Sequence, residues 1–326
     1  MGAYIVQRFF YAIITLFGVT IVAFALLNLQ PGDPAELLLG PYATPEAVRI
    51  LHRELRLDDP LWARYTGFLG NLFSGKLQSI YFKQPVFSLL LERFPSTVEL
   101  TIGALFIAAI VATSTGIVSA VKRDTPFDYA ASASSLFGIS MPDFWLGTML
   151  ILVFAVTLRW FPAFGHGPVS FATAITLLVT KGDVTSLAAF FHHLALPALT
   201  LSAHVIGVVT RVIRTSMLEE INKEYVMVLR SKGLAERTVV IKHMFRNSLI
   251  PVLTISSMQF VKLLGGAIIV ETVFGWPGVG LLMMDAIYAR DYPLVQAGIF
   301  FFSLFFIVVN LIVDLLYTFL DPRIRY

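Results

Sequence analysis

A stretch at residues 70–77 has the residue types of a phosphate-binding loop. Gly70, Gly75 and Lys76 are spaced as in the GxxxxGK pattern, whose backbone N–H groups and lysine hold nucleotide phosphates. That pattern also needs a serine or threonine after the lysine and a preceding β-strand. Leu77 follows the lysine, and the surrounding pattern is helical. We therefore predict that this chain binds no nucleotide cofactor itself.

Two other places could support enzymatic or metal chemistry. Gly138 and Ser140 lie in a stretch similar to the serine motif of six-span intramembrane proteases, but a serine nucleophile needs a histidine base, and His204 is the only histidine at membrane depth. We favour small residues at a helix crossing, and we predict no catalytic residue. His192 and His193 are adjacent on a predicted helix and point about 100° apart, so we predict no metal site there.

A stripe of polar and small residues follows one predicted membrane helix. Ser256, Gln259, Lys262 and Gly266 recur every three or four residues of an apolar run. A charge at mid-membrane costs about 3 kcal/mol, so it usually faces a water-filled path or a partner. We predict that these four residues line a translocation path. Helix packing, with Lys262 reaching an interface, is the alternative.

The composition is that of a membrane protein. The chain has 326 residues, of which 57% are hydrophobic and 14% charged, and it has no cysteine. About six runs are long enough to cross a bilayer, which takes roughly 20 residues. We therefore predict an all-α, polytopic membrane protein with a single membrane domain over residues 1–326. The predicted spans are Phe9–Leu29, Thr97–Val121, Ala133–Leu158, Ala195–Met217, Pro251–Glu271 and Leu294–Thr318.

Basic residues predict the orientation. Lys122 and Arg123 follow the second span, eight Lys or Arg lie between Arg211 and Arg246, and two more close the chain. Because cytoplasmic loops carry an excess of Lys and Arg, both termini and residues 218–250 are predicted to be cytoplasmic.

Residues 30–96 are then predicted to form an extracytoplasmic helical cap. The pairs Thr44-Pro45 and Asp59-Pro60 are helix starts, and Pro85 begins a third helix.

Residues 218–250 read as two short basic helices joined by a glycine. Glu219 and Glu220 are interpreted as solvated acids of a first helical turn, and Gly233 as the left-handed residue that ends the first helix. The second helix is predicted from Glu236 to Asn247. Ala235 stands where a hydroxyl residue would cap that helix.

The run from Tyr225 to Pro251 resembles the coupling loop of binding-protein-dependent ATP-binding-cassette importers, and more narrowly their dipeptide/oligopeptide permease branch. Met227-Val228-Leu229 departs from the Glu-Ala-Ala of the general motif, whereas the glycine is kept. The resemblance implies that the loop presents a short helix to a separate ATPase. The residues that it implies for this role are Glu224, Tyr225, Arg230, Lys232, Gly233, Leu234, His243, Arg246 and Asn247.

A second cluster, after the fifth span, resembles the outer gate of the same branch. The indole of Trp276 is predicted to lie at the membrane interface. The residues of this cluster are Glu271, Trp276, Pro277, Gly278 and Gly280.

The resemblance implies a permease subunit in a bacterial inner membrane. Its implied partners are a second, similar permease, two ATPase subunits that hold ATP and Mg²⁺, an extracytoplasmic binding protein and lipid; no nucleic acid is expected. Dipeptides, oligopeptides, glutathione, heme and nickel remain possible substrates. An ATP-independent secondary carrier and an intramembrane serine protease are the alternative functions; a carrier would show repeats and several midplane charges, which the sequence lacks.

Overall fold

The computed structural model describes residues 2–28, 33–40, 44–54 and 57–320. Regular structure in these ranges is helical, apart from one isolated bridge between Gln78 and Pro85. The predicted turn at Pro31-Gly32 lies outside the described residues, as does the basic C-terminal end. The chain divides into one unit of residues 1–95 and 278–312 and a second unit of residues 96–277 and 313–325.

The long apolar helices confirm a polytopic membrane protein. Within the described residues, four helices are long and apolar enough to cross a membrane, and two broken pairs bring the total to as many as six. The four are Gln7–Leu26, Val86–Val121, Val184–Ile221 and Tyr292–Ile312, and the pairs are Pro126–Ser140 with Asp143–Thr157 and Gly265–Phe274 with Val279–Tyr288.

The predicted continuous span from Ala133 to Leu158 is wrong. Helix α6 (Pro126–Ser140) ends before Pro142, and α7 (Asp143–Leu150) with the π-helix η1 (Ile151–Thr157) leaves at an angle of 112°. Met141 adopts an extended conformation, with ψ 130°, because the ring of a following proline disfavours the helical region. This span is therefore bent at Met141–Pro142.

The first unit confirms the predicted helix starts of the outer segment. The N–H of Ala47 donates to the Thr44 hydroxyl at the start of α3, and α4 follows Pro60. Phe68 and Leu72 of α4 are buried in this unit's apolar cluster with Val86 and Leu90. The helices of the unit are α1 (Gly2–Asn28), α2 (Pro34–Leu39), α3 (Pro45–Glu54), α4 (Leu61–Phe73), α13 (Val279–Tyr288) and most of α14 (Tyr292–Leu320).

Helix α5 (Val86–Val121) runs through Pro95 from the first unit into the second. The helix predicted to begin at Pro85 is therefore the first part of the second span, not a separate element of the cap.

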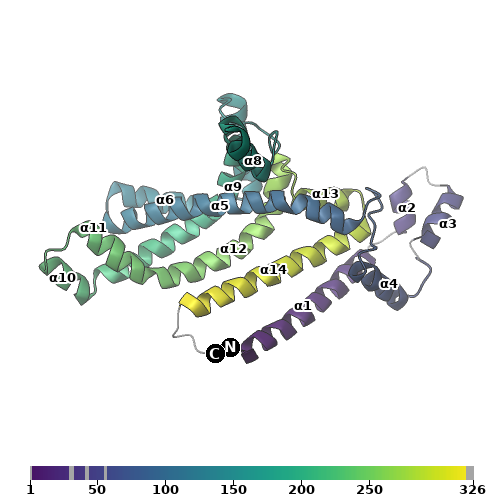
Figure 1. Cartoon of the computed structure of the whole chain (residues 1–326), viewed down its shortest axis with the longest axis horizontal. Helices are drawn as coiled ribbons and strands as arrows, with labels where there is room; N and C mark the ends of the chain where they lie inside the picture. The colour runs from purple at the N-terminus through teal and green to yellow at the C-terminus, as the bar shows by residue number, and fades with distance from the viewer. Residues whose placement is uncertain (1, 29–32, 41–43, 55–56, 321–326) are drawn as a thin grey trace. The chain divides into compact units, whose positions relative to one another are not determined.

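The second unit is built around α9 (Val184–Ile221), whose residues supply much of the unit's buried apolar cluster. Helix α8 (Phe171–Lys181) precedes the start of α9, and α10 (Glu224–Ser231) follows its end, so α8 and α10 lie at opposite ends of this long helix (Figure 1). Helix α11 (Glu236–Thr238) and the π-helix η2 (Val239–Phe245) then lead without a break into α12 (Arg246–Phe274). The second helix of the loop is thus continuous with the fifth span.

Candidate coupling loop

The loop is attached to the second unit through Glu220, in the last turn of α9. Only 6% of Glu220 is exposed, so its interpretation as a solvated acid is wrong. Its carboxylate accepts hydrogen bonds from the ammonium of Lys223, the hydroxyl of Tyr225 and, at 3.4 Å, the side-chain amide of Asn247. These four residues, the Glu220 cluster, join the end of α9, α10 and the start of α12.

The Tyr225 hydroxyl is held as a donor within this cluster. Burial and then the hydrogen bond to Glu220 raise the pKa of Tyr225 above its ordinary value, so the phenol keeps its proton. The amide of Asn247 also donates to the Tyr225 oxygen at 3.2 Å. The three side chains therefore form a closed set of hydrogen bonds.

Helix α10 has one buried side and one exposed apolar side. Val226 is fully buried in the unit's core, and Tyr225 and Leu229 pack against that core. In contrast, Met227 is 72% exposed and Val228 is 51% exposed. Two adjacent, exposed apolar side chains on this short helix are suited to contact with another protein.

Gly233 ends α10 in the predicted left-handed conformation, with φ +74°. Its N–H donates to the carbonyl of Arg230 at 2.9 Å, and the N–H of Leu234 donates to that of Leu229 at 3.4 Å. This pair of bonds is the Schellman motif. No atom lies within 4 Å of where a Cβ on Gly233 would be, so the glycine is required by backbone conformation and not by crowding.

A salt bridge spans the turn. The guanidinium of Arg230 donates to both carboxylate oxygens of Glu236, at 2.6 and 3.1 Å, and Arg230 holds the pKa of Glu236 below its usual value. Both side chains are about half exposed, so the pair contributes only about 0.2–1 kcal/mol. Ala235 is the N-cap of α11 and makes no side-chain cap, as predicted.

The remaining residues predicted for the coupling loop differ in their exposure to solvent. Glu224, Lys232 and Arg246 are exposed, and His243 is half-buried in η2. Val239 and Met244 of the same π-helix are fully buried and anchor it to the core.

The residues of the polar stripe on α12 differ in how deeply they are buried. Gln259 is buried, Ser256 is half-buried and Lys262 is exposed. A Cβ added to Gly266 would lie 3.2 Å from a carboxylate oxygen of Asp143, so the glycine permits this close approach of α7. The structure thus places Gly266 at a helix contact and Lys262 on the surface of the chain.

Trp276, which the sequence predicts to be an interfacial anchor, is buried inside the second unit. It is fully buried, its indole N–H donates to the carbonyl of Ser96 at 2.8 Å, and its ring centroid lies 4.5 Å from that of His166. His166 in turn bonds the carboxylate of Glu99 at 2.7 Å. The indole has a hydrogen-bond partner inside the unit, which removes its need for interfacial water.

The other residues of the predicted outer gate surround Trp276 in sequence. Glu271 is fully buried, and its carbonyl accepts the N–H of Trp276 at 2.8 Å. Pro277 follows the tryptophan, Gly278 is the N-cap of α13, and Gly280 is buried in the first turn of that helix.

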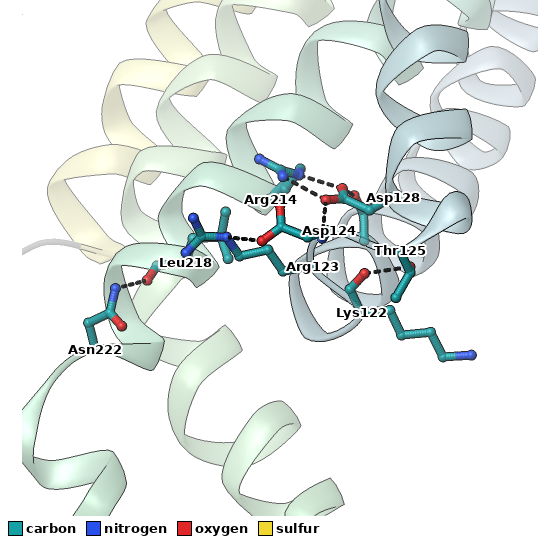
Figure 2. A network of polar contacts seen from close by, with 9 residues as sticks. Lys122, Arg123, Asp124, Thr125, Asp128, Arg214, Leu218 and Asn222 are labelled. Atoms are coloured by element: carbon teal, nitrogen blue, oxygen red, sulfur yellow. Dashed lines mark hydrogen bonds and ion pairs between the residues drawn. The ribbon is translucent and has the colours of Figure 1, made fainter.

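Sequence reasoning missed an ion pair beside the loop. Asp128, in the first turn of α6, accepts bonds from Nε and Nη2 of Arg214 on α9, at 2.6 and 2.7 Å (Figure 2). Ser119 on α5 and the backbone N–H of Asp124 also donate to this carboxylate. The two charges are 86 residues apart, and no local pattern joins them.

Three residues of the motifs that suggested enzymatic or metal chemistry make structural contacts: Gly138, His192 and His193. A Cβ on Gly138 would meet the carbonyl of Ala203 at 2.8 Å, which confirms a helix crossing. His192 and His193 bond the backbone carbonyls of Trp160 and Ala189, at 2.6 and 2.9 Å. Among the described residues, no group of three or more His, Cys, Asp or Glu could hold a metal ion.

Two family models together match most of the chain. Residues 112–326 match the family described as "Binding-protein-dependent transport system inner membrane component", and residues 1–101 match the corresponding N-terminal family.

Curated relatives match over their full lengths. A dipeptide transport system permease protein of Alkalihalophilus pseudofirmus is 39% identical, with 100% of both chains covered. A di/tripeptide transport system permease protein of Pseudomonas aeruginosa is 40% identical, covering 100% of this chain and 99% of the relative. A glutathione transport system permease protein of Escherichia coli is 39% identical, with 99% of each covered.

A solved structure shares the fold. A chain of the MetNI methionine ABC transporter, in inward-facing conformations, aligns with 73% of this chain and 98% of its own length. The TM-score is 0.54 at 14% identity, so this likeness concerns the fold alone.

Proposed function

This chain belongs to the family of inner-membrane components of binding-protein-dependent transport systems, and from this membership we propose that it forms part of the translocation path of an ATP-driven importer for di- or oligopeptides. The relatives named for dipeptide and di/tripeptide transport support this substrate class. The relative named for glutathione transport supports a small peptide with an unusual linkage as the second candidate.

The observation that carries the mechanism is the exposed apolar side of α10. Met227 and Val228 lie on a helix that Val226 and the Glu220 cluster hold against the core. This arrangement supports docking of α10 into a groove of a separate ATPase subunit, so that closure of the ATPase dimer on ATP displaces α10 and, with it, the end of α9. ATP and Mg²⁺ would then bind to two ATPase subunits, one docked on this chain and the other on a second permease subunit.

The experiment that tests the function is uptake by the purified complex in proteoliposomes. We expect uptake of labelled dipeptide only with ATP on the ATPase side and binding protein on the other side. Uptake by this chain without an ATPase would instead identify a secondary carrier. Competition by glutathione, heme or nickel would assign the substrate among the remaining candidates.

The orientation is a separate prediction, in which the loop is cytoplasmic and residues 30–96 form the extracytoplasmic cap. Because the chain has no cysteine, single cysteines report the side directly. Ser231→Cys should react with an impermeant maleimide only from the cytoplasmic side, and Lys76→Cys only from outside. Both positions are exposed, whereas Ser79, a more obvious choice in the cap, is buried against Asp291 and would label poorly. The reverse labelling pattern would refute the orientation.

The path assignment predicts an effect of Lys262 on substrate choice. If Lys262 lines the path with Ser256, Gln259 and Gly266, its charge favours anionic groups such as a peptide carboxylate. Lys262→Met should assemble normally, and its uptake of acidic dipeptides should fall about tenfold relative to neutral ones, the effect of about 1.4 kcal/mol. Lys262→Arg is the matched control and should keep the preference. If Lys262→Met lowers only the amount of assembled complex and leaves the substrate preference unchanged, Lys262 is a packing residue.

The gate assignment remains a proposal for Glu271, Trp276, Pro277, Gly278 and Gly280. The buried bond from Trp276 to Ser96 supports a fixed element at this place, against which neighbouring segments could move.

A further inference from the structure

The last two turns of α9 carry two polar anchors. Glu220 holds α10 through Lys223, Tyr225 and Asn247, as described above. Arg214, six residues earlier on the same helix, holds the carboxylate of Asp128. The same short piece of helix is therefore fixed both to the loop and to the start of α6.

Asp128 joins three elements at one carboxylate. It is 1% exposed and accepts from Arg214 on α9, from Ser119 near the end of α5 and from the N–H of Asp124. Asp124 belongs to the corner at residues 122–125, which joins α5 to α6 and is closed by a bond from the hydroxyl of Thr125 to the carbonyl of Lys122 at 2.6 Å. Figure 2 shows the guanidinium and the carboxylate facing each other beside this corner.

The geometry of the pair fixes direction as well as distance. Two parallel bonds, Nε to Oδ1 and Nη2 to Oδ2, align the planar guanidinium with the carboxylate. A lysine at position 214 would keep the charge but offer a single rotatable point contact.

Helices α5, α6 and α9 are closely packed beside the Asp128–Arg214 pair. A Cβ on Gly116 of α5 would lie 2.7 Å from Cβ of Ile213, and one on Gly207 of α9 would lie 2.5 Å from the carbonyl of Ser135 on α6. The helices therefore approach so closely at these glycines that a side chain would not fit. A glycine has no side chain that could interlock with its neighbour, whereas the Asp128–Arg214 pair is a directional contact between α6 and α9.

We propose that Asp128 and Arg214 are positioning residues that make the end of α9, the corner at residues 122–125 and the start of α6 move as one body. Displacement of α10 then reaches α6, which ends at the bend of Met141 and Pro142. The proposal rests on the function proposed above. It adds that the force from the loop is delivered to the bent span through this ion pair.

The test uses the assembled transporter with its binding protein. Arg214→Lys and Asp128→Asn should assemble at the wild-type level and retain ATPase activity, because α10 and the Glu220 cluster are unchanged. Uptake per ATP hydrolysed should fall about tenfold, within the range of ordinary coupling between sites. Arg211→Lys, an exposed arginine three residues away, is the matched control and should behave as wild type.

A distance measurement separates coupling from stability. Spin labels at the exposed positions Lys122 and Glu219 should give one narrow distance distribution in wild type and Arg211→Lys, unchanged by ATP. The distribution should broaden in Arg214→Lys.

Two results would overturn the proposal: an equally narrow distribution in Arg214→Lys, or variants that lose only complex and keep wild-type uptake per ATP. Neither result would affect the proposed function, which would fail instead if the wild-type complex showed no ATP-dependent uptake.

Discussion

Replacing Gly233 by valine is expected to lower uptake at least tenfold while leaving membrane insertion near normal. At φ +74°, a β-branched residue costs about 1–2 kcal/mol in the left-handed region, and the Schellman turn can relieve this cost by opening. Helix α10 would then present Met227 and Val228 at a different angle. ATPase stimulation by loaded binding protein, and uptake with it, should fall at least tenfold.

Two variants make this prediction specific. Gly233→Asn should keep most of the activity, because asparagine tolerates the left-handed conformation better than other side chains and no neighbouring atom lies within 4 Å of its Cβ. Glu219→Gln, on the exposed side of the last turn of α9, should have no measurable effect. Full transport by Gly233→Val would mean that the turn plays no part in coupling.

The features that could be predicted from the sequence are those determined by residues adjacent in the chain. The left-handed conformation of Gly233 and the helix starts at Thr44 and Pro60 follow from a few adjacent residues, and the structure confirms them. The membrane helices follow from long apolar runs, because the bilayer imposes one minimum length on every span.

The features that were missed depend on residues far apart in the chain. Glu220 is bonded to Asn247, 27 residues away, as well as to its near neighbours Lys223 and Tyr225, and Asp128 meets Arg214 across 86 residues. Trp276 has the residue type of an interfacial anchor, but the carbonyl of Ser96, 180 residues away, gives its N–H a buried partner. In each case the local pattern was compatible with solvent or lipid, and tertiary packing decided otherwise.

The break at Met141–Pro142 could be predicted from the sequence in part. Proline predicts an interruption of the helix, but not an angle of 112°. Helix α6 lies close to α9, where a Cβ on Gly138 would meet the carbonyl of Ala203. The proline therefore marks where the span can bend, whereas the angle depends on tertiary packing, which no local pattern specifies.

Replacing Glu220 by alanine should loosen α10 without unfolding the membrane helices. The change removes a buried carboxylate that accepts from Lys223, Tyr225 and Asn247; Asn247 can still donate to the Tyr225 oxygen, but the Tyr225 hydroxyl loses its acceptor. Hydrogen bonds to charged groups contribute about 1.5–3 kcal/mol, and the half-exposed Lys223 adds little, so we expect α10 to be destabilised by about 2 kcal/mol.

Amide hydrogen exchange in residues 222–232 of the nucleotide-free complex measures this loss. A change of about 2 kcal/mol corresponds to roughly thirtyfold faster exchange of the protected amides, since each 1.4 kcal/mol is a factor of ten. The exchange rate of Glu220→Gln should lie between those of wild type and Glu220→Ala. The glutamine amide oxygen can still accept from Tyr225, but it carries no charge to pair with Lys223. Glu219→Ala, which removes an exposed carboxylate from the same turn, should exchange as wild type does. Equal exchange in Glu220→Ala and Glu219→Ala would show that the Glu220 cluster does not hold α10, and that the packing of Val226 alone is sufficient.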